Sequence, residues 1–132
     1  MRVLATIALL CLSAPVSAAE IEGRWRSPGG NSIIEIAPCG SDYCGIVAWA
    51  SDKAKQDAAK TTSQLVGMQL LTDLKEIKPD RWQGKLFVPD RNMRVTAKIQ
   101  LASPGQLKVT GCAAAVLWHT QYWNKYDDPL PQ

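Results

Sequence analysis

The sequence predicts an all-β domain, folded as an antiparallel barrel or sandwich, and three observations carry this prediction. Short segments rich in β-branched and aromatic residues recur along the chain, and one of them alternates apolar and polar residues over nine positions. Turn-forming residues separate these segments at short intervals. Helical periodicity is absent between the predicted strands, which favours antiparallel pairing.

The composition is typical of one folded domain. The chain has 132 residues, of which 46% are hydrophobic and 20% are charged, and these values argue against a disordered chain. The formal net charge is only +3, and the basic residues are scattered along the sequence. We therefore expect no nucleic-acid partner, because a nucleic-acid-binding protein gathers its basic residues on one face.

Residues 1–19 have the three-part pattern of a secretory signal peptide. A basic start at Arg2 precedes an apolar run over residues 3–12 and small residues up to Ala18 and Ala19. The apolar run is about ten residues long, whereas a membrane-spanning helix needs about 20. We expect removal of residues 1–19, a periplasmic or secreted location, and no membrane span after the signal is removed.

The first strands are expected at residues 21–26, 32–37 and 45–50. A turn that contains Gly and Asp separates Cys39 from Cys44, and if the flanking strands pair, a disulfide between them is geometrically allowed. The closed loop is short, so the bond would add about 2 kcal/mol to the free energy of unfolding. The third cysteine of the exported chain, Cys112, would then be unpaired and buried as a small hydrophobe.

The polar segment at residues 51–64 interrupts the strand pattern, and we expect a short helical or loop insertion there. Ser51 can cap a helix that runs from Asp52 to about Lys60. Two interpretations follow: a solvated excursion between strands, which we prefer, or a lid over the mouth of a barrel. The apolar residues from Leu65 to Leu71 are expected to rejoin the sheet.

The second half of the chain carries the clearest strand signals. Residues 93–101 alternate strictly, which predicts a strand with one buried and one solvated face. Asn92 ends the preceding turn and can adopt the left-handed conformation. Residues 127–132 contain two prolines and are expected to form a flexible tail. Further strands are expected at residues 82–88, 106–110 and 119–123.

An ordered set of short motifs spans nearly the whole exported chain. These motifs are Gly23-x-Trp25, Pro38-Cys39-Gly40, Cys44-Gly45, Gly111-Cys112 and Gln121-x-Trp123. The set resembles the bacterial secreted family called domain of unknown function 2147. That resemblance implies a small lipocalin-like, up-and-down antiparallel β-barrel of about eight strands over residues 20–126. It supplies no established activity.

The resemblance to lipocalins also implies a structural pair that closes one end of the barrel. In lipocalins the indole of an early Gly-x-Trp is covered by a basic residue of the last strand, and Trp25 and Lys125 are the candidates here. A cation over an indole face contributes roughly 0.5–1 kcal/mol at an exposed site. Glycine at position 23 would let the backbone bend tightly beside the ring.

Catalytic chemistry finds little support in the sequence. His119 is the only histidine, and no motif ties a nucleophile to it, so we interpret it as an ordinary strand residue. A metal site is also disfavoured, because no second cysteine pair completes four ligands with Cys39 and Cys44. We expect no catalytic residue, no metal and no cofactor.

The surplus of tryptophan points to ligand binding instead. The rings either line a cavity wide enough for one small ligand or fill the barrel as core, and the sequence favours neither. The expected function is a non-enzymatic binding module for a small apolar ligand. The alternative is an envelope protein or inhibitor that binds another protein, and a hydrolase or isomerase is less supported. The candidate ligand contacts are Trp49, Trp82, Trp118 and Trp123.

Overall fold

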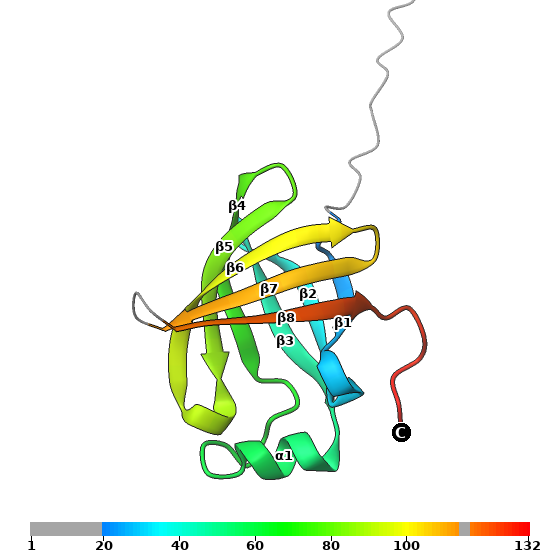
Figure 1. The fold of residues 1–132 in the computed structure, drawn as a ribbon. Helices are drawn as coiled ribbons and strands as arrows, with labels where there is room; N and C mark the ends of the chain where they lie inside the picture. The colour runs from blue at the N-terminus through cyan, green and yellow to red at the C-terminus, as the bar shows by residue number, and fades with distance from the viewer. Residues whose placement is uncertain (1–19, 114–116) are drawn as a thin grey trace, which may run out of the picture.

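The computed structural model describes residues 20–113 and 117–132, and it shows a closed barrel of eight antiparallel strands in chain order (Figure 1). Trp25 pairs with Lys125 and Arg26 with Asn124, so the first and last strands close the ring. The predicted fold class is therefore confirmed. The strands are β1 (Gly23–Arg26), β2 (Ser32–Cys39), β3 (Asp42–Ala50), β4 (Gln69–Lys78), β5 (Arg81–Val88), β6 (Met93–Ser103), β7 (Gln106–Ala113) and β8 (Leu117–Lys125).

Period-two alternation builds the barrel wall most clearly in β6. Val95, Ala97 and Ile99 are buried in the interior, while Arg94 and Lys98 are exposed outside. The turn before β6 is a short 3-10 segment, η2 (Pro89–Arg91), and Asn92 ends it with φ 47°. The left-handed conformation expected for Asn92 is thus confirmed.

The fourth strand is longer than the sequence indicated and also less regular. β4 runs from Gln69 to Lys78, but its register shifts between Thr72 and Lys75 on the β5 side. Asp73 lies inside this irregularity with φ 53°. Because a bulge resets the alternation of side chains, the apolar residues of β4 do not repeat every second position.

An indole and a cation are in contact at one end of the barrel, which we call the sealed end. The Trp25 side chain is 1% exposed, and its Nε1 donates to the Ile21 carbonyl at 2.8 Å. Lys125 Nζ lies 4.8 Å from the ring centroid and donates to the Glu22 carbonyl at 2.7 Å. The two residues named from the sequence as a closing pair are therefore in contact.

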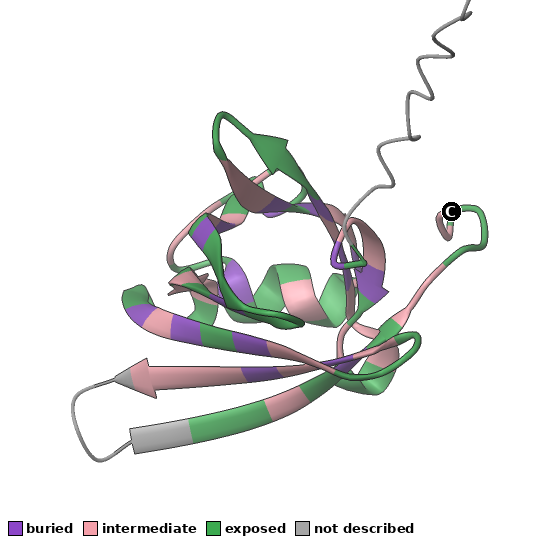
Figure 2. Ribbon diagram, turned by 90° about the horizontal axis from the view of Figure 1, so that it is seen from above, coloured by how far each residue is buried: buried purple, intermediate pink, exposed green. Residues whose placement is uncertain are grey.

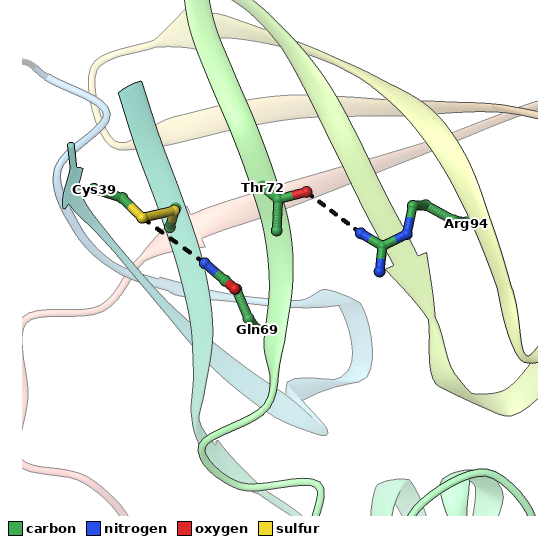
Figure 3. Close-up of a disulfide and its surroundings, with 5 residues drawn as sticks. Cys39, Gln69, Thr72 and Arg94 are labelled. Atoms are coloured by element: carbon green, nitrogen blue, oxygen red, sulfur yellow. Dashed lines mark hydrogen bonds between the residues drawn. A yellow bond between two sulfur atoms is a disulfide. The ribbon is translucent and has the colours of Figure 1, made fainter. Parts of the chain in front are cut away.

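The predicted disulfide is present at the turn between β2 and β3. Cys39 and Cys44 are bonded, with their Cα atoms 5.4 Å apart, and Gln69 Nε2 of β4 lies 3.8 Å from Cys39 Sγ (Figure 3). Cys112 forms no disulfide in the described part of the chain. It is half-buried in the barrel wall and not fully buried as expected, because the alternation of β7 turns it away from the interior.

Candidate binding cavity

The opposite end of the barrel opens into a cavity of about 590 Å³. Three connecting segments border it: η1 (Pro28–Gly30) between β1 and β2, α1 (Asp52–Ala58) between β3 and β4, and η2 between β5 and β6. Helix α1 crosses this end of the barrel in Figure 1, and Figure 2 shows it beyond the ring of strands. The interior is therefore sealed by Trp25 at one end and hollow at the other.

Apolar side chains from seven strands form the walls. Each strand contributes an inward-facing residue because the alternation that solvates the outer face turns every second side chain inward. Gly111 has no side chain, which leaves room in the wall beside Val95 and Leu86. These are the two residues nearest to where a Cβ of residue 111 would lie. The apolar wall residues are Ile34, Val47, Leu70, Leu86, Val95, Val109 and Trp123.

Helix α1 is part of the cavity and not a solvated excursion, which corrects the interpretation preferred from the sequence. Ala54 and Ala58 line the cavity from the helix, and Ala58 is 3% exposed. Ser51 caps the helix by accepting from the Ala54 amide at 3.1 Å, and its hydroxyl donates to Asn31 Oδ1 at 3.0 Å. The cap therefore ties the helix to the segment that precedes β2. The helix ends at Ala58, slightly before the expected Lys60.

A directed chain of polar groups runs along the inner face of β8. Trp123 Nε1 lies 3.2 Å from Gln121 Oε1, and Gln121 Nε2 lies 3.4 Å from His119 Nε2. An indole can only donate, so the Gln121 oxygen accepts and its nitrogen donates to His119. All three residues line the cavity.

Charged groups are confined to the mouth of the cavity. Asp57 lies on α1 and forms an ion pair with Lys53 at 2.8 Å. Asp90 and Arg91 come from η2, and with Asp57 they are the lining residues that carry formal charge. The cavity thus has an apolar interior and a polar entrance, as is common in sites for small organic ligands.

The tryptophans expected to contact a ligand do not gather in one place. Trp123 is in the cavity wall, whereas Trp82 packs in the core, 2% exposed, and its Nε1 has no hydrogen-bond partner among the described residues. Trp49 follows a register shift in β3 that leaves Val47 and Ala50 buried, and it is not in the cavity lining. The side chain of Trp118 lies outside the described residues.

His119 and Gln121 are the cavity residues that the sequence reasoning missed. The alternation of β8 placed them on one face with Trp123, but two polar residues do not mark that face as the interior. Their polarity is tolerated because they lie toward the open end, where His119 is exposed. The only signal was the position of Trp123 on the same face.

The described residues do not bring Cys112 and His119 together, and they do not group metal ligands. Cys112 and His119 lie in neighbouring strands but on opposite faces of the wall, so they form no nucleophile and base pair. Over residues 20–113 and 117–132, no three His, Cys, Asp or Glu side chains are grouped as metal ligands would be. Among these same residues, no helix has the length and apolar character needed to span a membrane.

Two comparisons with known proteins give a match. The profile of a bacterial family described as "Uncharacterized protein conserved in bacteria (DUF2147)" matches residues 23–125. A solved Helicobacter pylori protein, HP1028, described as belonging to the lipocalin family, superposes with a TM-score of 0.63. It shares 16% sequence identity, over 84% of this chain and 86% of its own, which shows a common fold alone. No curated protein matches the chain in sequence.

Proposed function

The chain belongs to the bacterial family DUF2147, and from its lipocalin-like barrel and cavity we propose that it is a non-enzymatic binding module for a small apolar ligand. The cavity carries the proposal. Its volume of about 590 Å³ lies within the range of roughly 300–1,000 Å³ that small-molecule sites occupy. Eight-stranded barrels are also about wide enough to hold one small ligand.

The lining supports an apolar guest that is oriented by a few polar groups. Burial of apolar ligand surface against these walls supplies about 25 cal/mol per Å² before the costs of binding. Trp123 contributes a flat aromatic surface to the wall, and Gln121 and His119 offer polar contacts near the entrance. Of the four tryptophans considered from the sequence, the proposal rests on Trp123.

The proposal includes an extracytoplasmic location. Residues 1–19 would act as the signal peptide, residues 20–126 would form the exported barrel, and residues 127–132 would be its flexible tail. A periplasmic or secreted location is compatible with the disulfide between Cys39 and Cys44, since such bonds persist in oxidising compartments.

A titration with the neutral dye N-phenyl-1-naphthylamine tests the binding function. The emission of this dye rises in apolar surroundings, so we expect saturable enhancement with the purified protein. Gly111→Phe should weaken the binding by about tenfold or more, because the new ring occupies the cavity. A Cβ at this position meets Val95 at 3.4 Å and Leu86 at 3.9 Å, so the wall accepts a side chain.

Thr110→Phe is the matched control, because it adds the same ring one residue away. Alternation along β7 places that ring outside the barrel, so dye affinity should equal that of the wild type. Thermal unfolding of both variants verifies that they are folded. Absence of saturable enhancement in the wild type, or equal loss in the two variants, contradicts the proposed function.

A further inference from the structure

Charge is distributed unevenly between strands β5 to β8 and the rest of the chain. Strands β5 to β8 contain six basic residues and no acidic residue, whereas the rest of residues 20–132 contains eight basic and twelve acidic residues. The net charge of +3 hides this separation. The six basic residues are Arg81, Lys85, Arg94, Lys98, Lys108 and Lys125.

Strand register collects five of these residues on one outer surface, which we call the basic face. It consists of Arg81, Lys85, Arg94, Lys98 and Lys108. They alternate with buried residues along each strand, such as Trp82 and Ile99, and they therefore point away from the interior. Lys125 is excluded because it covers Trp25 at the sealed end.

The cross-strand neighbours of Lys98 and Lys108 are uncharged. Lys98 lies between Gln83 and Thr110, and Lys108 lies between Gln100 and Tyr122. Strands β5 to β8 themselves carry no Asp or Glu. The three strands that carry the face, β5, β6 and β7, lie side by side in the barrel wall (Figure 1).

The face also holds a hollow of about 410 Å³. Arg81, Lys98 and Lys108 line it together with glutamine and threonine side chains, and no carboxylate is among its described lining residues. Ile77 lies at its edge and is 54% exposed, and Tyr122, paired with Lys108, is 47% exposed. Cations flanked by an apolar and an amphipathic side chain match the chemistry of a lipid headgroup layer.

We propose that the basic face binds the surface of an anionic lipid bilayer. A bilayer presents one sign of charge over a broad area, and the basic face presents the opposite sign over three strands, β5 to β7. The acidic remainder of the chain would be repelled, so the charge separation also fixes the orientation of the barrel. This inference goes beyond the proposed ligand-binding function and does not depend on the cavity.

Nucleic acid fits the basic face less well than a bilayer does. Binding to single strands relies on exposed aromatic rings that stack on bases, and the reading of duplex DNA needs a helix or ribbon that enters a groove. The described part of the face offers one exposed aromatic residue, Tyr122, on a broad sheet. A bilayer requires neither feature, because diffuse attraction to headgroups is sufficient.

Co-sedimentation of the mature protein (residues 20–132) with phosphatidylcholine vesicles, with and without phosphatidylglycerol, tests the proposal. We expect binding only to the vesicles that contain phosphatidylglycerol, and loss of that binding as ionic strength rises. Arg81→Gln with Lys108→Gln should reduce the partition coefficient by about thirtyfold, since each basic residue near an anionic surface contributes about fivefold.

The matched control is Lys55→Gln with Lys60→Gln, which removes the same charge from the α1 segment. It should bind vesicles like the wild type, and so should Gly111→Phe, which separates this proposal from the cavity. Equal binding to both vesicle types, no binding at low ionic strength, or equal loss in the two double variants overturns the proposal. Tighter binding to a single-stranded oligonucleotide, or self-association that needs Arg81 and Lys108, also overturns it.

Discussion

Gly23 satisfies two constraints at the sealed end of the barrel. Its φ is +121°, and a Cβ there would overlap Lys125 Nζ. Gly23→Ala therefore strains the backbone and displaces the ammonium from Trp25, and we expect a loss of about 3 kcal/mol in the free energy of unfolding. Urea unfolding measures the loss.

Gly40→Ala serves as the control for Gly23→Ala. Gly40 also has a positive φ, +66°, but a Cβ there meets nothing within 4 Å. Gly40→Ala should therefore lower the free energy of unfolding by about 1 kcal/mol, which is the cost of the left-handed backbone alone. Equal losses at the two positions would show that contact with Lys125 contributes nothing to the strain.

Tyr43 gives the barrel a dependence on alkaline pH. Burial raises the pKa of its phenol above the ordinary value of 10.0, and the negative charges of Glu22 and Glu76 raise it further. The folded protein therefore holds this proton more tightly than the unfolded chain, so the stability is complete below about pH 10 and falls as the pH rises through the folded pKa. Tyr43→Phe should unfold in urea with a shallower decline above about pH 10. An unchanged slope would contradict the prediction.

Residues at the sealed end could be predicted better than residues of the cavity. The resemblance to lipocalins named Trp25 and Lys125 as a pair, and the structure places the ammonium 4.8 Å from the ring centroid. His119 and Gln121 gave no such signal, because polar residues on an inward face are allowed only near an open end. Sequence alone does not show where that end lies.

The cap of α1 links the helix to Asn31, which directly precedes the neighbouring strand β2. Ser51→Ala removes both the bond from the Ala54 amide and the bond to Asn31, and we expect a loss of about 1 kcal/mol in stability. Hydrogen exchange should accelerate over residues 52–58. Ser63→Ala, a change at an exposed residue beyond the helix, should leave that exchange unchanged. Similar acceleration in both variants would argue against the capping role.

Reduction of the disulfide tests how far one hairpin supports the barrel. The bond closes a short loop, with a sequence separation of 5. The free energy of unfolding of the Cys39→Ser and Cys44→Ser double variant should therefore be about 2 kcal/mol lower than that of the wild type. Urea unfolding should still be cooperative, because the hydrogen-bonded ring of strands does not depend on this bond. Loss of cooperative unfolding would show that the disulfide is essential to the fold.

The sequence predicted that these segments are strands, but it did not predict where each strand begins and ends. β6 was evident because its alternation is unbroken, and its neighbours were evident from turn residues. β4 was foreseen only at its start, because the bulge at Asp73 interrupts the pattern. Helix α1 was foreseen through Ser51, but its role over the cavity depends on where the barrel mouth lies.

At the scale of the whole molecule, strand register produces the basic face and the cavity, and neither can be recognised from the composition. Basic residues such as Arg81, Lys98 and Lys108 are far apart in the sequence, and their spacing alone does not indicate a common surface. Pairing of β5 with β6 and of β6 with β7 brings them onto one face. Register depends on contacts between distant segments, so neither the basic face nor the cavity volume could be derived from local patterns.

The central claim is that an apolar molecule enters the barrel beside Trp123, and indole NMR signals test it most directly. Trp123 Nε1 bonds to Gln121 in the cavity wall, whereas Trp25 Nε1 bonds to the Ile21 carbonyl at the sealed end. Addition of N-phenyl-1-naphthylamine should shift the Trp123 indole signal saturably and leave the Trp25 signal in place. An unmoved Trp123 signal at saturating dye would contradict the account.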